Sequence, residues 1–149
     1  MGVCPQTSFA AGLSVDDRAV PGFHRHSLGV TKDSLGRWGE DFAAVHLATL
    51  GWTILDRNWR CRAGELDIVA LEPGPPPCLV AVEVKTKAGP GFGDPLEAIT
   101  VAKVARLGRL ALWWQRCHRG VPERLRLDAV GVTKLAGQAP QLRHVRGLS

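Results

Sequence analysis

Two stretches in the middle of the chain alternate between apolar and polar residues, which is the pattern of β-strands with one buried face. They run from Glu65 to Leu71 and from Leu79 to Lys87, and a proline-rich loop at residues 73–77 joins them. Each stretch points three apolar side chains to one face: Leu66, Ile68 and Ala70 in the first, and Val80, Val82 and Val84 in the second. The sequence therefore predicts an antiparallel hairpin that packs one apolar face against a core.

Charged side chains occupy the opposite face of this hairpin: Glu65 and Asp67 on the first strand, and Glu83, Lys85 and Lys87 on the second. Two registers bring the apolar faces together, and they place Asp67 opposite either Glu83 or Lys85. Directly opposed carboxylates repel each other unless cations compensate them. Lys85 supplies one positive charge. Mg²⁺ or Mn²⁺ would supply two more, because these ions favour carboxylate oxygen ligands.

A Glu–Lys ladder on a solvated face would explain the same charges, and the Glu-x-Lys pattern alone does not exclude it. The other residues on the charged face are apolar, however: Val69, Leu71, Leu79 and Ala81. Carboxylates at the edge of a face that is otherwise buried are hard to explain by solvation. The pattern favours a compensated carboxylate pair and leaves the solvated ladder open as the alternative.

A helix is predicted before the hairpin. Asp33 and Ser34 offer an N-cap, and apolar residues recur at helical spacing to about Leu50. Gly51 follows at the position where a left-handed C-cap is expected. Glu40 lies within this helix, and its spacing leaves open whether it is solvated or points to the carboxylates of the hairpin.

A second helix is expected to begin at the capping box Asp94-Pro95-Leu96-Glu97 and to run to about Cys117. Further strands are expected at three places: Trp52 to Trp59, Arg126 to Val132, and Gln141 to Val145. The order of elements is then α-β-β-β-α-β-β. This order predicts an α/β fold with a mixed sheet flanked by helices, because a helix between two strands permits a parallel crossover.

The first part of the chain, residues 1–32, has no sustained period, and we expect a disordered or loosely attached tail before one domain at residues 33–149. His24 and His26 in this tail are expected to be solvated. The cysteines show no metal-binding spacing: Cys4, Cys61, Cys78 and Cys117. Isolated cysteines of this kind are typical of reduced thiols in a cytoplasmic protein. No apolar run is long enough to span a membrane.

The chain is basic, with a net charge of +5 and 19 Lys and Arg residues, most of them Arg. Arginine suits bidentate contact with phosphate, so the charge balance suggests a nucleic-acid partner. The candidates for phosphate contact lie around the predicted hairpin and on the second helix: Arg57, Arg60, Arg62, Lys87, Lys103 and Arg106. A solvated surface charge is the alternative for each of them taken singly.

An Asp on one strand, Glu-x-Lys on the next, and a Glu on the preceding helix resemble the PD-(D/E)XK nuclease superfamily. The sequence is most similar to its YraN-type family of predicted endonucleases, which is related to archaeal Holliday-junction resolvases. The matching stretches are GRWGEDFAA, RNWRCRAGELDIVA, VAVEVKTK, GFGDPLEAI and RLDAV, and they span about residues 35 to 133. Leu66 stands where the superfamily name has proline, directly before Asp67.

The resemblance implies a restriction-endonuclease-like fold and a Mg²⁺- or Mn²⁺-dependent enzyme that hydrolyses DNA to a 3′-hydroxyl and a 5′-phosphate. It implies that Asp67 and Glu83 are metal ligands, that Lys85 is the catalytic lysine, and that Glu40 is a supporting acid. It leaves open whether the enzyme selects junctions or repair intermediates, and whether it is a monomer or a homodimer. A nucleic-acid-binding protein that keeps this fold without turnover is the alternative.

Overall fold

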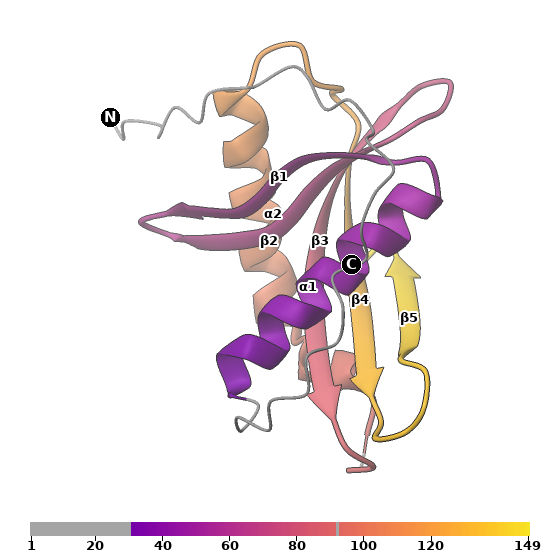
Figure 1. Cartoon of the computed structure of the whole chain (residues 1–149). Coiled ribbons are helices and arrows are strands. Elements are labelled where there is room, and N and C mark those ends of the chain that lie inside the picture. Colours follow the sequence, from indigo (N-terminus) through magenta and orange to yellow (C-terminus); the bar gives the residue numbers. More distant parts are fainter. Residues whose placement is uncertain (1–30, 92) are drawn as a thin grey trace.

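The computed structural model describes residues 31–91 and 93–149, in which a five-stranded mixed sheet lies between two α-helices (Figure 1). The elements are α1 (Lys32–Thr49), β1 (Thr53–Cys61), β2 (Gly64–Glu72), β3 (Cys78–Ala88), the 3₁₀ helix η1 (Pro95–Ala98), α2 (Val101–Cys117), β4 (Leu125–Lys134) and β5 (Gln141–Arg146). This architecture confirms the predicted α/β class and is consistent with a restriction-endonuclease-like fold. All but the last two residues of the expected tail, with His24 and His26, lie outside the described residues, and Lys32 already belongs to α1.

The strands lie side by side in chain order, from β1 at one edge of the sheet to β5 at the other. β3 and β4 are parallel, which confirms the predicted crossover, and the other neighbours are antiparallel. Leu71 lies opposite Leu79, and Ile68 lies opposite Val82. This is one of the two registers expected from the apolar alternation. Continued by one residue, it sets Asp67 opposite Glu83.

Both faces of the sheet are buried, because α1 crosses one face and α2 covers the other (Figure 1). The core under α1 includes Ala43, Leu47, Ile68, Ala70, Val80, Val82, Val84, Val130 and Val132. The core under α2 includes Trp59, Leu66, Val69, Leu79, Ala81, Leu107, Leu110 and Trp114. A sheet covered on both sides explains why apolar residues occupy both faces of the central strands.

Leu66 departs from the predicted alternation. The pattern predicts that it shares a face with Ile68 and Ala70, but it packs in the core under α2, on the other side of the sheet. The pairing of β2 with β3 ends at Ile68, and Asn58 on the neighbouring strand has a left-handed φ of 52°. These irregularities reorient β2 around Asp67, so the period of two does not continue through that residue.

The start of α1 also differs from the prediction. The N-cap is Thr31 and not Asp33 or Ser34, because the Thr31 hydroxyl accepts a hydrogen bond from the Ser34 backbone N–H at 3.2 Å. Asp33 lies instead in the first turn, where its charge suits the positive end of the helix dipole. The predicted C-terminal end is confirmed, since Gly51 follows the last turn with a φ of 81°.

The predicted continuous helix from Asp94 to Cys117 is wrong, because it is divided into η1 and α2. Asp94 caps η1 as expected, accepting a hydrogen bond from the Leu96 N–H at 2.9 Å. The chain then becomes extended at Ile99, and Thr100 caps α2 by accepting from the Lys103 N–H at 3.2 Å. Neither α-helix of the described residues is long and apolar enough to cross a membrane.

A buried polar network joins β4 to β5. Asp128 is fully buried, and its carboxylate accepts two hydrogen bonds from Arg126, at 2.8 and 3.0 Å, and one from the Gly147 N–H at 3.0 Å. His144 Nε2 lies 2.9 Å from the same carboxylate. Burial alone would raise the pKa of Asp128, but the bonds to His144 and Arg126 outweigh it and hold the pKa below its ordinary value. None of the predicted site residues takes part in these hydrogen bonds to Asp128.

Candidate active site

The candidate site lies where the sheet divides. Beyond Ile68 and Val82, β2 continues beside β1 while β3 continues beside β4, and the β1–β2 hairpin turns away from the rest of the sheet (Figure 1). Asp67 is the first residue of β2 past this point. Its Oδ2 accepts a hydrogen bond from the Val84 backbone N–H at 2.8 Å. The carboxylate therefore takes the place of a ladder hydrogen bond and stands between the two diverging strands.

Glu83 lies across the division on β3, and its side chain is 5% exposed. Its Oε1 receives two ammonium groups, Lys85 Nζ at 2.6 Å and Lys103 Nζ at 2.6 Å. Lys85 is its neighbour on the same face of β3, as the alternation predicts, whereas Lys103 comes from the first turn of α2. Paired charges of this kind tolerate burial far better than a lone carboxylate.

Glu40 reaches the site from α1, and close packing beside it explains its position. A Cβ atom on Gly39 would collide with the Thr86 side chain, so glycine lets α1 approach β3 closely at this point. The Oε2 atom of Glu40 is buried and has no hydrogen-bond partner among the described residues. Of the two alternatives left open by the helix spacing, the structure supports the one in which Glu40 points toward the carboxylates of the hairpin.

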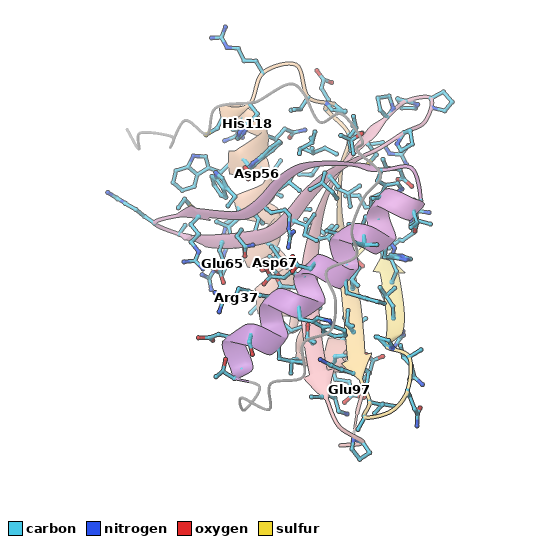
Figure 2. The ribbon with its side chains drawn as sticks, in the orientation of Figure 1. Arg37, Asp56, Glu65, Asp67, Glu97 and His118 are labelled. Atoms are coloured by element: carbon cyan, nitrogen blue, oxygen red, sulfur yellow. The ribbon has the colours of Figure 1, made fainter. Side chains whose placement is uncertain are left out.

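These side chains line one cavity of about 340 Å³ between the two helices. Glu40 comes from α1, Asp67 from β2, Glu83 and Lys85 from β3, and Lys103 and Arg106 from α2. Figure 2 shows Asp67 beside α1, with Glu65 further along the same strand and Arg37 on the neighbouring turn of the helix. Glu65 from β2 and Lys32 from α1 also line the cavity, which thus gathers four carboxylates and four cationic side chains from four separate elements.

The charges in the cavity alter its proton affinities. Burial, and then the negative charge of Glu83, raise the pKa of Asp67 to about 7, although the Val84 N–H and Lys85 act in the opposite direction. Burial would lower the pKa of Lys85, but its hydrogen bond to Glu83 and the surrounding carboxylate charge outweigh burial and raise that pKa. Lys85 is therefore a cation at neutral pH. The positive charge near Asp67 is nevertheless too small to stabilise its ionised form fully.

The residues fit a magnesium ion better than a metal held entirely by protein. Among the described residues, no three His, Cys, Asp or Glu side chains are placed to hold a metal by themselves. Mg²⁺ is commonly bound through one or two carboxylates, with waters and substrate phosphates completing its shell. Asp67 and Glu83 supply such a pair. The raised pKa of Asp67 and the unpartnered oxygen of Glu40 indicate that these carboxylates are not fully neutralised by nearby positive charge, which a metal ion would supply.

The six candidates for phosphate contact fall into two groups. Lys103 and Arg106 line the cavity, and Arg106 also donates from Nε to the Ala63 carbonyl at 3.2 Å. Lys103 was predicted only as a phosphate contact, so its pairing with Glu83 was missed. Lys103 comes 18 positions after Lys85, in the helix of the crossover between β3 and β4, and its basic charge was the one signal available in the sequence.

The other four candidates lie outside the cavity. Arg57 pairs with Asp41 at 2.6 Å, and Arg60 pairs with Glu65 at 3.1 Å. The Lys87 ammonium donates to the carbonyl oxygens of Gly91 and Gly93, which follow β3 in the chain. Arg62 is exposed in the turn between β1 and β2. Their predicted contact with phosphate stays a prediction.

Residues 39–132 match the model of a protein family described as uncharacterised protein family UPF0102. The chain belongs to this family. UPF0102 is the YraN family indicated by the sequence motifs, so the resemblance is confirmed. The matched range contains the candidate-site residues from Glu40 on α1 to Arg106 on α2.

Relatives in several bacteria carry the same family name. The UPF0102 protein of Acidothermus cellulolyticus is 45% identical over 126 residues, which cover 78% of this chain and 93% of the relative. That of Kineococcus radiotolerans is 47% identical over 119 residues, covering 79% and 95%. That of Clavibacter michiganensis is 47% identical over 115 residues, covering 77% and 95%. Similarity at this level extends over most of each protein.

Proposed function

We propose that this UPF0102 protein is a metal-dependent endonuclease that hydrolyses phosphodiester bonds in DNA. The main support is the position of Asp67 and Glu83 at the division between β2 and β3, with Lys85 bonded to Glu83 inside an open cavity. A protein that merely binds nucleic acid has no need of opposed carboxylates facing a phosphate. The Arg-rich composition and the basic side chains at the cavity edge support an anionic substrate.

Asp67 and Glu83 would hold the Mg²⁺ or Mn²⁺ ion. When bound, that ion would neutralise phosphate charge and make water a better nucleophile. Glu40 would hold the attacking water, because its buried Oε2 is free to accept a hydrogen bond among the described residues. Its role is therefore to orient the nucleophile and receive a proton from it.

Lys85 would act on the transition state as a fixed cation. Its raised pKa keeps the ammonium protonated at neutral pH, so it donates hydrogen bonds and does not serve as the base. Lys103 and Arg106 would contact the phosphate from the side of α2. Their role is positioning, and they carry no information about base sequence.

The test is cleavage of a panel of duplex, flap, single-stranded and four-way-junction DNA with Mg²⁺, Mn²⁺ or EDTA. We expect metal-dependent cleavage by the parent protein and its loss in Glu83→Gln. Lys85→Ala should bind DNA normally and cleave about 10²- to 10⁴-fold more slowly. Glu123→Gln, an exposed acid away from the cavity, is the control and should cleave at the parental rate.

Two results would contradict the proposal. Tight DNA binding without cleavage of any substrate, with either metal, would favour the non-catalytic binding protein. A Glu83→Gln protein that cleaves at the parental rate would place the chemistry outside this cavity.

A further inference from the structure

We propose that one flank of α2 is a track for an unpaired DNA strand, leading away from the candidate active site. The flank consists of Arg106, Arg109, Trp113 and Arg116, and we call it the α2 track. The role of the track in cleavage rests on the proposed nuclease function, whereas its ability to bind a single strand does not. It adds a substrate feature, a single-stranded segment next to the bond that is cut.

The spacing of these residues puts them on one side of the helix. They are three, four and three positions apart, which is the repeat of a single helical face. Ten residues separate Arg106 from Arg116, so the track is about 15 Å long at 1.5 Å per residue. Arg106 also lines the candidate active-site cavity, so the track begins there. Figure 2 shows that His118, just past the last turn of α2, lies well apart from Asp67 on β2.

The track is positively charged without local compensation. The sequence of α2 from Val101 to Cys117 contains no Asp or Glu. Elsewhere, Arg57, Arg60 and Arg143 are paired with carboxylates. Within residues 31–91 and 93–149, by contrast, the three arginines of the track form no ion pair with an acidic side chain. Arginines kept clear of acids along one line are complementary to a chain of phosphates.

Trp113 favours a single strand as the occupant over a duplex. It lies between Arg109 and Arg116 and is half-buried, at a groove that these three residues share with Leu112. The ring is held against buried Trp59, with centroids 6.3 Å apart and planes at 78°. A fixed indole beside arginines is the arrangement that stacks unpaired bases, whereas the faces of bases inside a duplex are covered by their neighbours.

The binding test uses a short fluorescein-labelled oligothymidine, with EDTA present so that no cleavage occurs, and measures fluorescence anisotropy. Trp113→Leu should weaken binding by about 5- to 100-fold, because one stacked base is lost while apolar contact with Trp59 is kept. The double variant Arg109→Gln/Arg116→Gln should make the negative slope of log K against log salt shallower by about 1.4, because two phosphate contacts are lost. Both arginines are exposed, so this variant should fold even if the tryptophan variant does not.

Matched controls lie away from the track. Trp38→Leu removes a half-buried tryptophan from α1, and Arg124→Gln removes an exposed arginine near the start of β4. Both controls should bind oligothymidine like the parent protein. Blunt duplex should bind Trp113→Leu about as well as it binds the parent.

Parental affinity in folded Trp113→Leu together with an unchanged salt slope in the double variant would overturn the proposal. So would the absence of oligothymidine binding by the parent protein. If the track instead joins two copies of the chain, these variants should sediment differently from the parent protein and bind oligothymidine equally well. That result would also overturn the proposal. The nuclease proposal fails separately, through Glu83→Gln and the metal-dependent cleavage assay.

Discussion

Replacing Asp67 with Asn should make the metal-free protein more stable at neutral and alkaline pH. The carboxylate is held in a position that disfavours its charge, because it is largely buried and faces Glu83. Asn has nearly the same shape and keeps an oxygen that can accept the Val84 N–H. The substitution therefore removes the unfavourable charge and preserves the bond between the diverging strands.

The size of the effect follows from the pKa. The pKa of Asp67 rises from 3.8 to about 7 on folding. A change of one unit in pKa corresponds to about 1.36 kcal/mol of folding free energy. The full difference is about 4 kcal/mol, and water at this open cavity screens part of it, so we expect a gain of about 2–4 kcal/mol above pH 7. The gain should be small near pH 4 and vanish below about pH 3, where the carboxyl group is neutral in both the folded and the unfolded protein. Between these limits the parent protein loses stability as pH rises, because its unfolded state releases the proton first.

Urea unfolding in EDTA at several pH values between 4 and 8 measures this difference. Glu65→Gln is the control, since Glu65 is an exposed acid on the same strand, and its change should stay within about 0.5 kcal/mol. Figure 2 shows how close the two acids lie along β2. An Asp67→Asn protein that is no more stable than the parent at pH 8, or equally stabilised at pH 4, would refute the reasoning.

Two other substitutions test the framework around the site. Asp128→Asn should cost about 3–5 kcal/mol in urea unfolding, because it breaks a buried charge network. The lowered pKa of Asp128 further predicts that its contribution is present above pH 3.8 and is lost as pH falls through the lower folded-state pKa. Gly39→Ala should cost about 1–3 kcal/mol, because its methyl group would collide with Thr86. Gly36→Ala, one turn earlier with open space around it, should be neutral or stabilising by up to about 1 kcal/mol, and equal effects of the two alanines would contradict the close packing.

Much of the fold could be predicted because the period of two is strong in the central strands. The valines from Val80 to Val84 and the apolar residues opposite them left few acceptable registers, and the observed pairing of Leu71 with Leu79 is one of them. The crossover between β3 and β4 followed from the helical segment between the strands. These features depend on neighbours along the chain, so the sequence displays them directly.

The failures occurred where tertiary contacts or competing caps decide the structure. Several side chains can cap the start of α1, and Thr31 does so in place of Asp33. The second helix breaks because η1 packs closely on β4. A Cβ atom on Gly131 would lie 2.9 Å from Pro95. Leu66 packs on the face opposite to the predicted one because β2 pairs with β3 only from Ile68 onward. None of these causes can be seen within a short window of sequence.

The two lysines of the candidate site illustrate the same limit. Lys85 lies two residues from Glu83 on one strand, so alternation alone places it beside that carboxylate. Lys103 reaches the same oxygen only after the chain has passed through η1 and started a new helix at Val101. Each helical residue turns the side chain by about 100°, so even a short interruption changes which side chains face the sheet. The break in the helix therefore helps to set which basic side chain of α2 meets Glu83, and a continuous helix from Asp94 would have aligned its charges differently.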